Sequence, residues 1–231
     1  MKTIFETDSD FICDIQAPCF QMLSQEEVEL VRSTKTQVLF RKGDTITKQG
    51  TFASYILFII NGLVKQYIES DTNRSYNLKI IEPGDFIGLS SVFSKNIYSY
   101  SSSAITDCRA FLVEKQTIEK LVKQNGMFAF SIINRYSKEN SNLFDSIGTV
   151  LFKQMNGRLA DTLLYINELK SNYPEIFQLL SRKDLADFSG ISMESAVKLL
   201  KNLEKENIIQ LKDKDIIIYD RAKLEKISKT G

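Results

Sequence analysis

Short hydrophobic runs separated by turn residues dominate residues 35–115. A Ser- and Thr-rich strand pair, "SYSSSAITDCRAFLV", ends this region. Before it, strands recur about every ten residues. They alternate with turns at Gly43, Gly50, Gly62, Gly84 and Gly88. The pattern predicts an antiparallel β-roll of the cupin-like or jelly-roll kind. A β-sandwich that binds no ligand fits the same pattern, and periodicity does not separate the two.

The periodicity becomes helical from Thr117, where "TIEKLVKQ" predicts a short helix and residues 126–151 a long one. Along the long helix, spacings of four and three residues mark the seam of a coiled coil. The seam residues are Ala129, Ile133, Tyr136, Asn140, Leu143, Ile147 and Val150. We expect them to pair with the same helix of a second copy, with the polar Asn140 fixing the register. A second apolar face is expected to pack on the helix's own β domain: Phe128, Ile132, Phe144 and Leu151. The alternative is that the seam itself packs there.

Two short amphipathic helices surround Gly190 in "SRKDLADFSGISMESAVKLLKNLEKENIIQ". Ser181 with Asp184 predicts a capping box at the start of the first helix, and Ser192 caps the second. Gly190 can adopt the positive φ of a tight exit from a helix. The arrangement is typical of a helix-turn-helix, although an ordinary helical hairpin has the same spacing.

The segment that follows favours the helix-turn-helix. Strands over Ile208–Leu211 and Ile216–Tyr219, around a charged turn at 212–215, predict a wing, and "RAKLEKIS" predicts a closing helix. The predicted fold class is therefore α+β. We expect a β-roll effector domain at 1–125, a dimerisation helix at 126–151 and a winged helix-turn-helix domain at 152–231.

Composition limits the function. The 231 residues are 43% hydrophobic and 26% charged, as in a soluble globular protein, and contain no histidine. A Ser-His-Asp triad and an imidazole general base are thereby excluded, and no phosphate-binding glycine loop is present, so we expect no enzyme. The acidic N-terminus and the lack of an apolar run near 18 residues predict a cytoplasmic protein that does not insert into a membrane.

Net charge argues only weakly about DNA binding. The whole chain carries +1, and residues 181–231 hold eleven Lys and Arg against nine Asp and Glu. Phosphate contacts require cations, so this balance argues against very tight nonspecific binding. It does not argue against recognition of a specific operator by a dimer.

The order of motifs resembles one known family along nearly the whole chain. "FRKGDTITKQG", "YILFIINGLVKQY" and "EPGDFIGL" precede a long helix, "GRLADTLLYI" and the helix pair around Gly190. This order is similar to that of the Crp/Fnr superfamily of bacterial transcription regulators. The resemblance implies a homodimer whose recognition helices enter successive major grooves of a near-palindromic site, with half-sites about 34 Å apart. It also implies RNA polymerase as a partner.

The resemblance assigns DNA contacts to "SMESAVK". Glu194 matches the family's base-reading glutamate, which can accept a hydrogen bond from cytosine N4. Lys198 stands where a second arginine is usual, and Met193 replaces the first arginine, leaving an apolar contact such as one to a thymine methyl. Ser192, Ser195 and Lys201 are candidate phosphate contacts, or else ordinary cap and surface residues.

The resemblance does not extend to the cyclic AMP contacts. Leu89 replaces the family's ribose-binding glutamate, and its phosphate-binding arginine falls near Tyr98 or Ser99. Burying a cyclic phosphate without a cation is costly, so cyclic AMP is disfavoured and the effector is unknown. The expected pocket is apolar, lined by Leu89, Tyr98, Tyr100, Leu143 and Phe144.

Two alternative functions remain. An Fnr-like iron-sulfur sensor would use Asp10, Cys13, Cys19 and Cys108, whose spacing partly matches the cluster ligands of that branch. The simpler expectation is no metal, with the cysteines as small buried side chains. A sensor module that regulates a protein partner without binding DNA is the other alternative.

Overall fold

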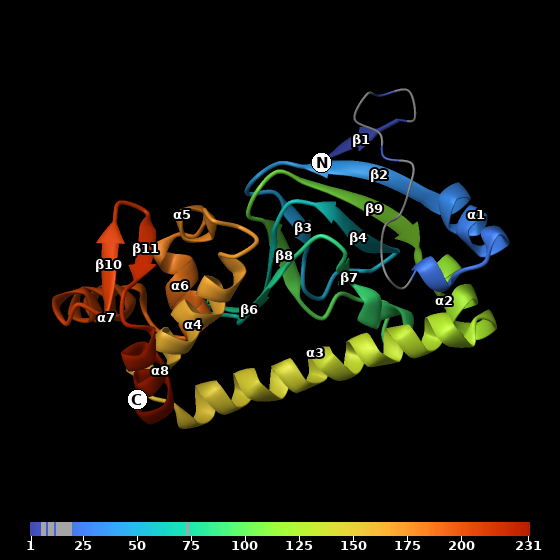
Figure 1. The fold of residues 1–231 in the computed structure, drawn as a ribbon. Coiled ribbons are helices and arrows are strands. Elements are labelled where there is room, and N and C mark those ends of the chain that lie inside the picture. The colour runs from blue at the N-terminus through green and yellow to red at the C-terminus, as the bar shows by residue number, and fades with distance from the viewer. Residues whose placement is uncertain (6–7, 9–11, 13–19, 73) are drawn as a thin grey trace. The chain divides into compact units, whose positions relative to one another are not determined.

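The computed structural model describes residues 1–5, 8, 12, 20–72 and 74–231 (Figure 1). The chain folds as two compact units. Residues 1–69 and 79–141 form the first unit, and residues 70–78 and 142–231 form the second. Among the described residues no helix is long and apolar enough to cross a membrane.

Two antiparallel sheets form the roll predicted for residues 35–115. One sheet has the strand order β1-β2-β9-β4-β7 and the other β3-β8-β5-β6. The strands are β1 (Lys2–Ile4), β2 (Lys35–Phe40), β3 (Thr45–Thr47), β4 (Tyr55–Asn61), β5 (Val64–Glu69), β6 (Ser75–Ile81), β7 (Phe86–Ile87), β8 (Ser101–Ala104) and β9 (Cys108–Glu114). Strand β9 pairs with β2 on one side and with β4 on the other, so it lies at the centre of its sheet.

Aromatic packing fills one part of the core. Phe20, which lies in the short helix η1 (Phe20–Met22), meets Phe58 edge to face at 5.7 Å between ring centroids. The ring of Phe20 also lies 5.8 Å from Phe86 and 6.0 Å from Phe128. Because these rings come from η1, two strands and the long helix, their burial joins distant parts of the chain into one core.

Helices of the first unit begin where side chains can satisfy free amides. Helix α1 (Gln25–Thr34) starts with a capping box between Ser24 and Glu27, with bonds of 2.8 and 3.3 Å. Helix α2 (Lys115–Gln124) ends at Asn125, whose Oδ1 accepts from the Phe128 amide at 2.9 Å. The long helix α3 (Gly126–Phe152) follows, as predicted.

The second unit contains the predicted helix pair and wing. Its elements are α4 (Met155–Leu169), α5 (Ile176–Leu179), α6 (Arg182–Ser189), α7 (Met193–Lys205), β10 (Ile209–Lys212), β11 (Asp215–Ile218) and α8 (Arg221–Thr230). The wing strands lie within one residue of their predicted bounds. Its core includes Leu159, Leu163, Leu200 and Leu224, which are all fully buried.

One prediction about α3 is half wrong. Phe128 and Ile132 are buried against the roll, as expected, but Phe144 and Leu151 are 65% and 68% exposed. Helical geometry places Phe144 and Leu151 about 160° and 140° around the axis from Phe128, so the four residues do not form one face.

Gly62 gives a test of packing at the start of β9. It has a φ of +88°, and a Cβ there would lie 2.7 Å from Cys108 Sγ and 2.8 Å from Cys108 Cα. Gly62→Ala should therefore destabilise the protein by about 2–4 kcal/mol, since backbone strain and overpacking add. Gly43→Ala is the matched control, because Gly43 has φ +89° and no atom within 4 Å of the added Cβ. Urea unfolding followed by circular dichroism measures both, and equal losses would contradict this account.

Candidate nucleic-acid interface and effector region

Local hydrogen bonds fix both ends of α6, including the turn that leads into α7. The Ser181 amide donates to the Asp184 carboxylate at 2.9 Å, and the Asp184 amide donates to Ser181 Oγ at 3.1 Å. At the other end of α6, Gly190 adopts a φ of +60°. The Ile191 amide then donates to the Ala186 carbonyl at 3.1 Å, as in a Schellman motif. The capping box and the glycine exit predicted from the sequence are both present.

Helix α7 presents one charged face. Ala196, Leu200 and Leu203 are buried at 0%, 1% and 8% exposure, which turns the opposite side of the helix to solvent. Glu194, Lys198 and Lys201 are exposed on that side at helical spacing. The three predicted residues therefore lie on one face.

Lys205 extends this face by one more turn and was not predicted. It is exposed four residues after Lys201, and that spacing was readable in the sequence. Lys198, Lys201 and Lys205 form no ion pair among the residues that the structure describes. Their ammonium groups are available to a phosphate backbone.

The other predicted DNA contacts lie at the start of α7. The Ser195 amide donates to Ser192 Oγ at 3.1 Å, so Ser192 is the helix cap. The Ser192 hydroxyl also donates to Ser195 Oγ. Met193 is 49% exposed beside them. The backbone amide of Glu194 and the Ser192 hydroxyl hold the pKa of the Glu194 carboxyl below its usual range, which keeps it an ionised acceptor.

In the roll, tyrosine rings surround Gly88. The Gly88 amide donates to Tyr100 Oη at 3.0 Å, and Tyr98 Oη donates to the Tyr55 carbonyl at 3.0 Å. A Cβ on Gly88 would lie 2.5 Å from the Tyr98 ring. Burial raises the pKa of Tyr98 to about 12 and raises that of Tyr100 as well, so both phenols are neutral.

Three of the five predicted pocket residues lie in this part of the roll. Leu89, in the short helix η2 (Leu89–Val92), is buried in the core, and Tyr98 and Tyr100 pack against the neighbouring cluster of buried residues. Leu143 and Phe144 belong to the second unit and are exposed. The rings themselves occupy the space beside Gly88.

Arg135, a cation on α3, already has partners in the roll. Arg135 donates to the Asp85 carboxylate at 2.5 Å and to the Gly84 carbonyl at 3.1 Å. Its guanidinium also lies 5.3 Å from the centre of the Phe86 ring. A bound phosphate would have to compete with this ion pair for Arg135.

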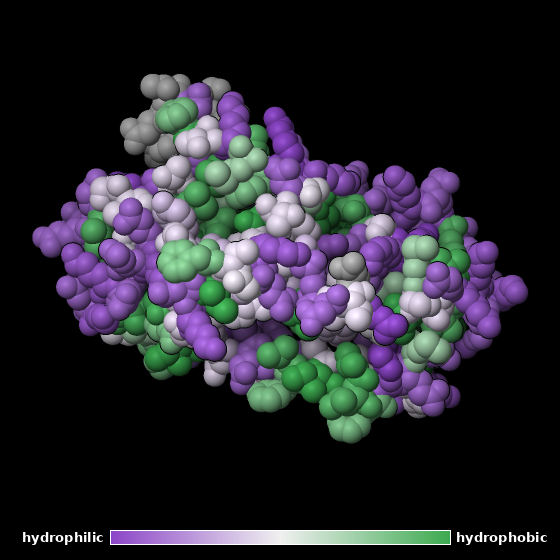
Figure 2. Space-filling view, turned by 180° about the vertical axis from the view of Figure 1, so that it is seen from behind, coloured by the Kyte–Doolittle hydropathy of each residue, from purple (hydrophilic) through white to green (hydrophobic). Residues whose placement is uncertain are grey.

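An apolar stripe remains exposed along α3. Its residues are between 45% and 68% exposed: Phe130, Ile133, Leu143, Phe144, Ile147 and Leu151. Figure 2 shows hydrophobic side chains gathered along the lower edge of the view, where α3 runs. Asn140 is exposed within the stripe, but Tyr136 is half-buried and meets Phe93 edge to face at 5.9 Å. Tyr136 thus packs in part against its own roll.

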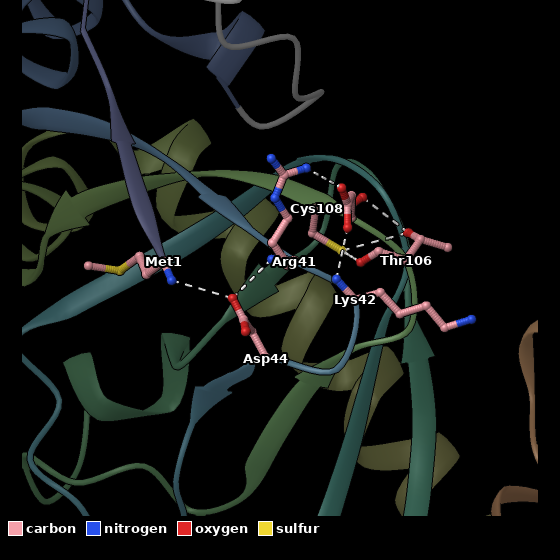
Figure 3. Close-up of polar contacts among 7 residues, drawn as sticks. Met1, Arg41, Lys42, Asp44, Thr106 and Cys108 are labelled. Atoms are coloured by element: carbon pink, nitrogen blue, oxygen red, sulfur yellow. Dashed lines mark hydrogen bonds and ion pairs between the residues drawn. The ribbon is translucent and has the colours of Figure 1, made fainter.

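Cys108 lies in a closed environment at the start of β9. Its sulfur is within hydrogen-bond distance of the carbonyl oxygens of Leu63 (3.2 Å) and Thr106 (3.1 Å), and Figure 3 shows it beside Thr106. Burial raises the pKa of the Cys108 thiol, which disfavours the thiolate that binds iron. This environment fits a small buried side chain. Asp10, Cys13 and Cys19 lie outside the described residues.

Comparison with known proteins identifies both halves of the chain. The family model for a cyclic nucleotide-binding domain matches residues 37–125, and the model for a Crp-like helix-turn-helix domain matches residues 157–227. The chain belongs to the Crp/Fnr family. Members of this family are DNA-binding transcription regulators.

Curated relatives and solved structures agree with this assignment. The cAMP-activated global transcriptional regulator CRP of Salmonella typhimurium is 25% identical over 179 residues, which are 76% of this chain and 85% of that protein. The anaerobic regulatory protein of Bacillus subtilis is 24% identical over 205 residues, 87% of this chain and 86% of that protein.

Two solved structures share the fold of this Crp/Fnr protein. A putative Crp/Fnr regulator from Eubacterium rectale has a TM-score of 0.77 at 19% identity, covering 92% of this chain and 98% of that one. FixK2 from Bradyrhizobium japonicum has a TM-score of 0.72 at 22% identity, covering 84% and 96%. At these identities the structures support the fold alone.

We expect no micromolar binding of cyclic AMP or cyclic GMP to the purified protein. The tyrosine rings fill the space beside Gly88, and Arg135 is paired, so a cyclic phosphate would be buried without a cation. Isothermal titration calorimetry checks this. Micromolar binding that disappears when Arg74 or Arg109 is replaced by Ala would show that the phosphate site lies elsewhere in the roll.

Proposed function

We propose that this Crp/Fnr protein is a homodimeric, sequence-specific DNA-binding transcription regulator that recognises a near-palindromic operator and responds to an effector other than cyclic AMP. The observation that carries the proposal is the exposed charged face of α7 in a Crp-like helix-turn-helix. RNA polymerase as a partner follows from family membership alone.

Base reading is assigned to the first two turns of α7. Glu194 is an ionised, exposed acceptor at the start of the helix, where the recognition helix of a helix-turn-helix meets base edges. Lys198 lies one turn further on the same face and can donate to guanine. Lys201 and Lys205 continue toward the C-terminal end of α7, where phosphate contact is more suitable than base contact.

Dimerisation is assigned to the exposed stripe of α3. The exposed stripe has alternating spacings of three and four residues along the helix. Its apolar positions are Phe130, Ile133, Phe144, Ile147 and Leu151, and Ser137 and Asn140 complete the series. A sustained stripe of this period on an exposed helix favours pairing with a second copy. Compared with the seam expected from the sequence, the stripe keeps Ile133, Asn140 and Ile147. It has Phe130, Ser137, Phe144 and Leu151 in place of Ala129, Tyr136, Leu143 and Val150.

Control by a non-nucleotide effector is supported by the roll. Leu89 stands in the core where the family's ribose-binding glutamate is expected, and neutral tyrosines adjoin Gly88. An apolar or aromatic ligand suits this lining better than a phosphate. A roll that binds no effector is the other alternative.

DNA recognition can be tested on duplexes selected by the protein from a random-sequence pool. Glu194→Ala should weaken operator binding by about 1–3 kcal/mol and relax the preference at one base pair per half-site. Lys201→Ala should weaken binding to all sequences alike. Lys226→Ala, on α8, is the control for loss of an exposed lysine. Unchanged operator preference in Glu194→Ala would contradict the assignment, and failure of the parent protein to bind any duplex would favour a sensor module that acts on a protein partner.

Dimerisation can be tested with a charge on the stripe. Phe144 is exposed in the single chain, so Phe144→Glu leaves the chain's own core intact but would bury a charge in both subunits of the dimer. An uncompensated buried charge costs about 3–5 kcal/mol, so the dimer dissociation constant should rise at least about 100-fold. Asn142→Glu, exposed on another side of α3, should have no such effect. Sedimentation velocity measures both, and a stable Phe144→Glu dimer would place the interface elsewhere.

A further inference from the structure

A carboxylate on α4 holds the junction between α3 and α4. Asp161 Oδ2 accepts a hydrogen bond from Lys153 Nζ at 2.6 Å and from Thr149 Oγ1 at 3.4 Å. Thr149 lies in the last turn of α3, and Lys153 is the first residue after that helix. The side chains of Lys153 and Asp161 are 29% and 25% exposed, so salt screens this ion pair less than a fully exposed one. The end of α3 is therefore bonded to the second turn of α4.

The closing helix α8 bonds to the same carboxylate. Ser228, which is 8% exposed, donates to Asp161 Oδ1, and Lys153 Nζ donates to Ser228 Oγ at 3.4 Å. The Gln154 amide donates to the Gly231 carbonyl at 3.1 Å. Figure 1 shows α8 beside the end of α3 and the start of α4, in agreement with these bonds. Three helices therefore meet at a junction cluster of four side chains: Thr149, Lys153, Asp161 and Ser228.

Gly157 allows α8 to come this close to α4. A Cβ on Gly157 would lie 2.6 Å from the Gly231 carbonyl oxygen and 3.4 Å from that of Ile227. Any larger residue would push α8 outward, because the atoms that it meets are backbone atoms. The glycine thus permits the close approach that brings Ser228 within reach of Asp161.

Arg158 connects the junction to the helix-turn-helix. Its Nε donates to the Lys153 carbonyl at 2.9 Å, and its Nη1 donates to the Gly190 carbonyl at 3.4 Å. Gly190 lies two residues before Ser192, the cap of α7. One side chain therefore bonds both to the α3–α4 junction and to the turn that precedes α7.

Part of the exposed stripe lies in the same compact unit as α7. The second unit contains residues 142–152 of α3 together with α4 to α8, and these α3 residues include Phe144, Ile147 and Leu151. The junction cluster therefore lies between the proposed dimer contact and α7 within one unit. In a two-fold dimer, the separation of the two α7 helices is fixed only if each α7 is fixed relative to its own stripe.

We propose that Asp161 and Ser228 are positioning residues that lock the α3–α4 junction, and that this lock sets the half-site spacing of the operator that the dimer accepts. The inference rests on the proposed function and adds a determinant of specificity that touches no DNA. Only Lys153 and Gln154 separate the two helices, so a few bonds are enough to restrict the backbone dihedrals there. Helix α8 is thereby assigned a part in operator selection.

The test is the spacing preference of the whole chain, measured by fluorescence anisotropy. It compares the duplex selected from the random pool with versions that have one base pair added or removed between the half-sites. One base pair moves a half-site by about 3.4 Å and rotates it by about 35°. The parent protein should lose about 100-fold in affinity on either changed duplex, because its two subunits no longer engage together.

Asp161→Ala and Ser228→Ala should each lose only about 10-fold on the changed duplexes, because an unlocked junction lets both subunits adjust. Thr230→Ala is the matched control for Ser228→Ala. It also removes a hydroxyl from α8, but that hydroxyl donates to the Lys226 carbonyl of its own helix. A variant that is merely less stable would bind every duplex more weakly and keep the parent's ratio between them.

Lys153→Met removes the ion pair from the other side of the junction. If Lys153 and Asp161 act through one lock, combining Lys153→Met with Asp161→Ala should reduce the discrimination no further than Asp161→Ala alone. Lys153→Met should itself reduce the discrimination, so it tests the lock even if a variant at Asp161 or Ser228 does not fold.

Equal binding of the parent protein to all three spacings would overturn the lock, as would variants that discriminate as strongly as the parent. An unchanged ratio in Ser228→Ala alone would overturn the role of α8, and additive losses in the double variant would overturn a single lock. Failure of the parent protein to bind any duplex would instead defeat the proposed function, which separates the two failures.

Discussion

Helix α7 is fixed in its domain by the burial of Ala196, Leu200 and Leu203. The buried face leaves no freedom in where Glu194, Lys198 and Lys201 point, because positions on a helix are related by its period. The start of the helix is set by Ser192 and its direction by the turn at Gly190. Glu204 then extends the same constraint to the wing through the Leu211 amide. A single packed face therefore orients both the recognition surface and the hairpin beside it.

The interior of the roll is filled by side chains beside Gly88. Members of this fold family include proteins described as cAMP-activated, and the cyclic nucleotide-binding domain is recognisable here. Around Gly88, aromatic rings and the buried Leu89 lie in the interior. Arg135 pairs with Asp85 within the unit itself. A domain can retain its backbone while its interior chemistry changes, since the sheets depend on hydrophobic packing and not on the ligand.

Helix α3 has a buried face and an exposed apolar stripe. Phe128 and Ile132 are buried in the roll core, and Tyr136 packs at its edge. The stripe from Phe130 to Leu151 remains exposed in the single chain. A contiguous apolar stripe exposed to water is unfavourable, which is why a second copy is the proposed occupant. The polar Asn140 lies within the stripe, where a polar residue can select one register.

Local interactions made much of this protein predictable from its sequence. The capping box at Ser181, the turn at Gly190, the wing and the charged face of α7 each depend on residues a few positions apart. Periodicity also predicted two apolar faces on α3, but it could not decide which face the roll covers, and the contact of Tyr136 with Phe93 appears only in the tertiary structure. The contact of Tyr98 with Gly88 and the bond from Glu204 to Leu211 were likewise decided only by the tertiary structure. Spacing shows which residues share a face, whereas the neighbour that meets that face depends on how distant segments pack.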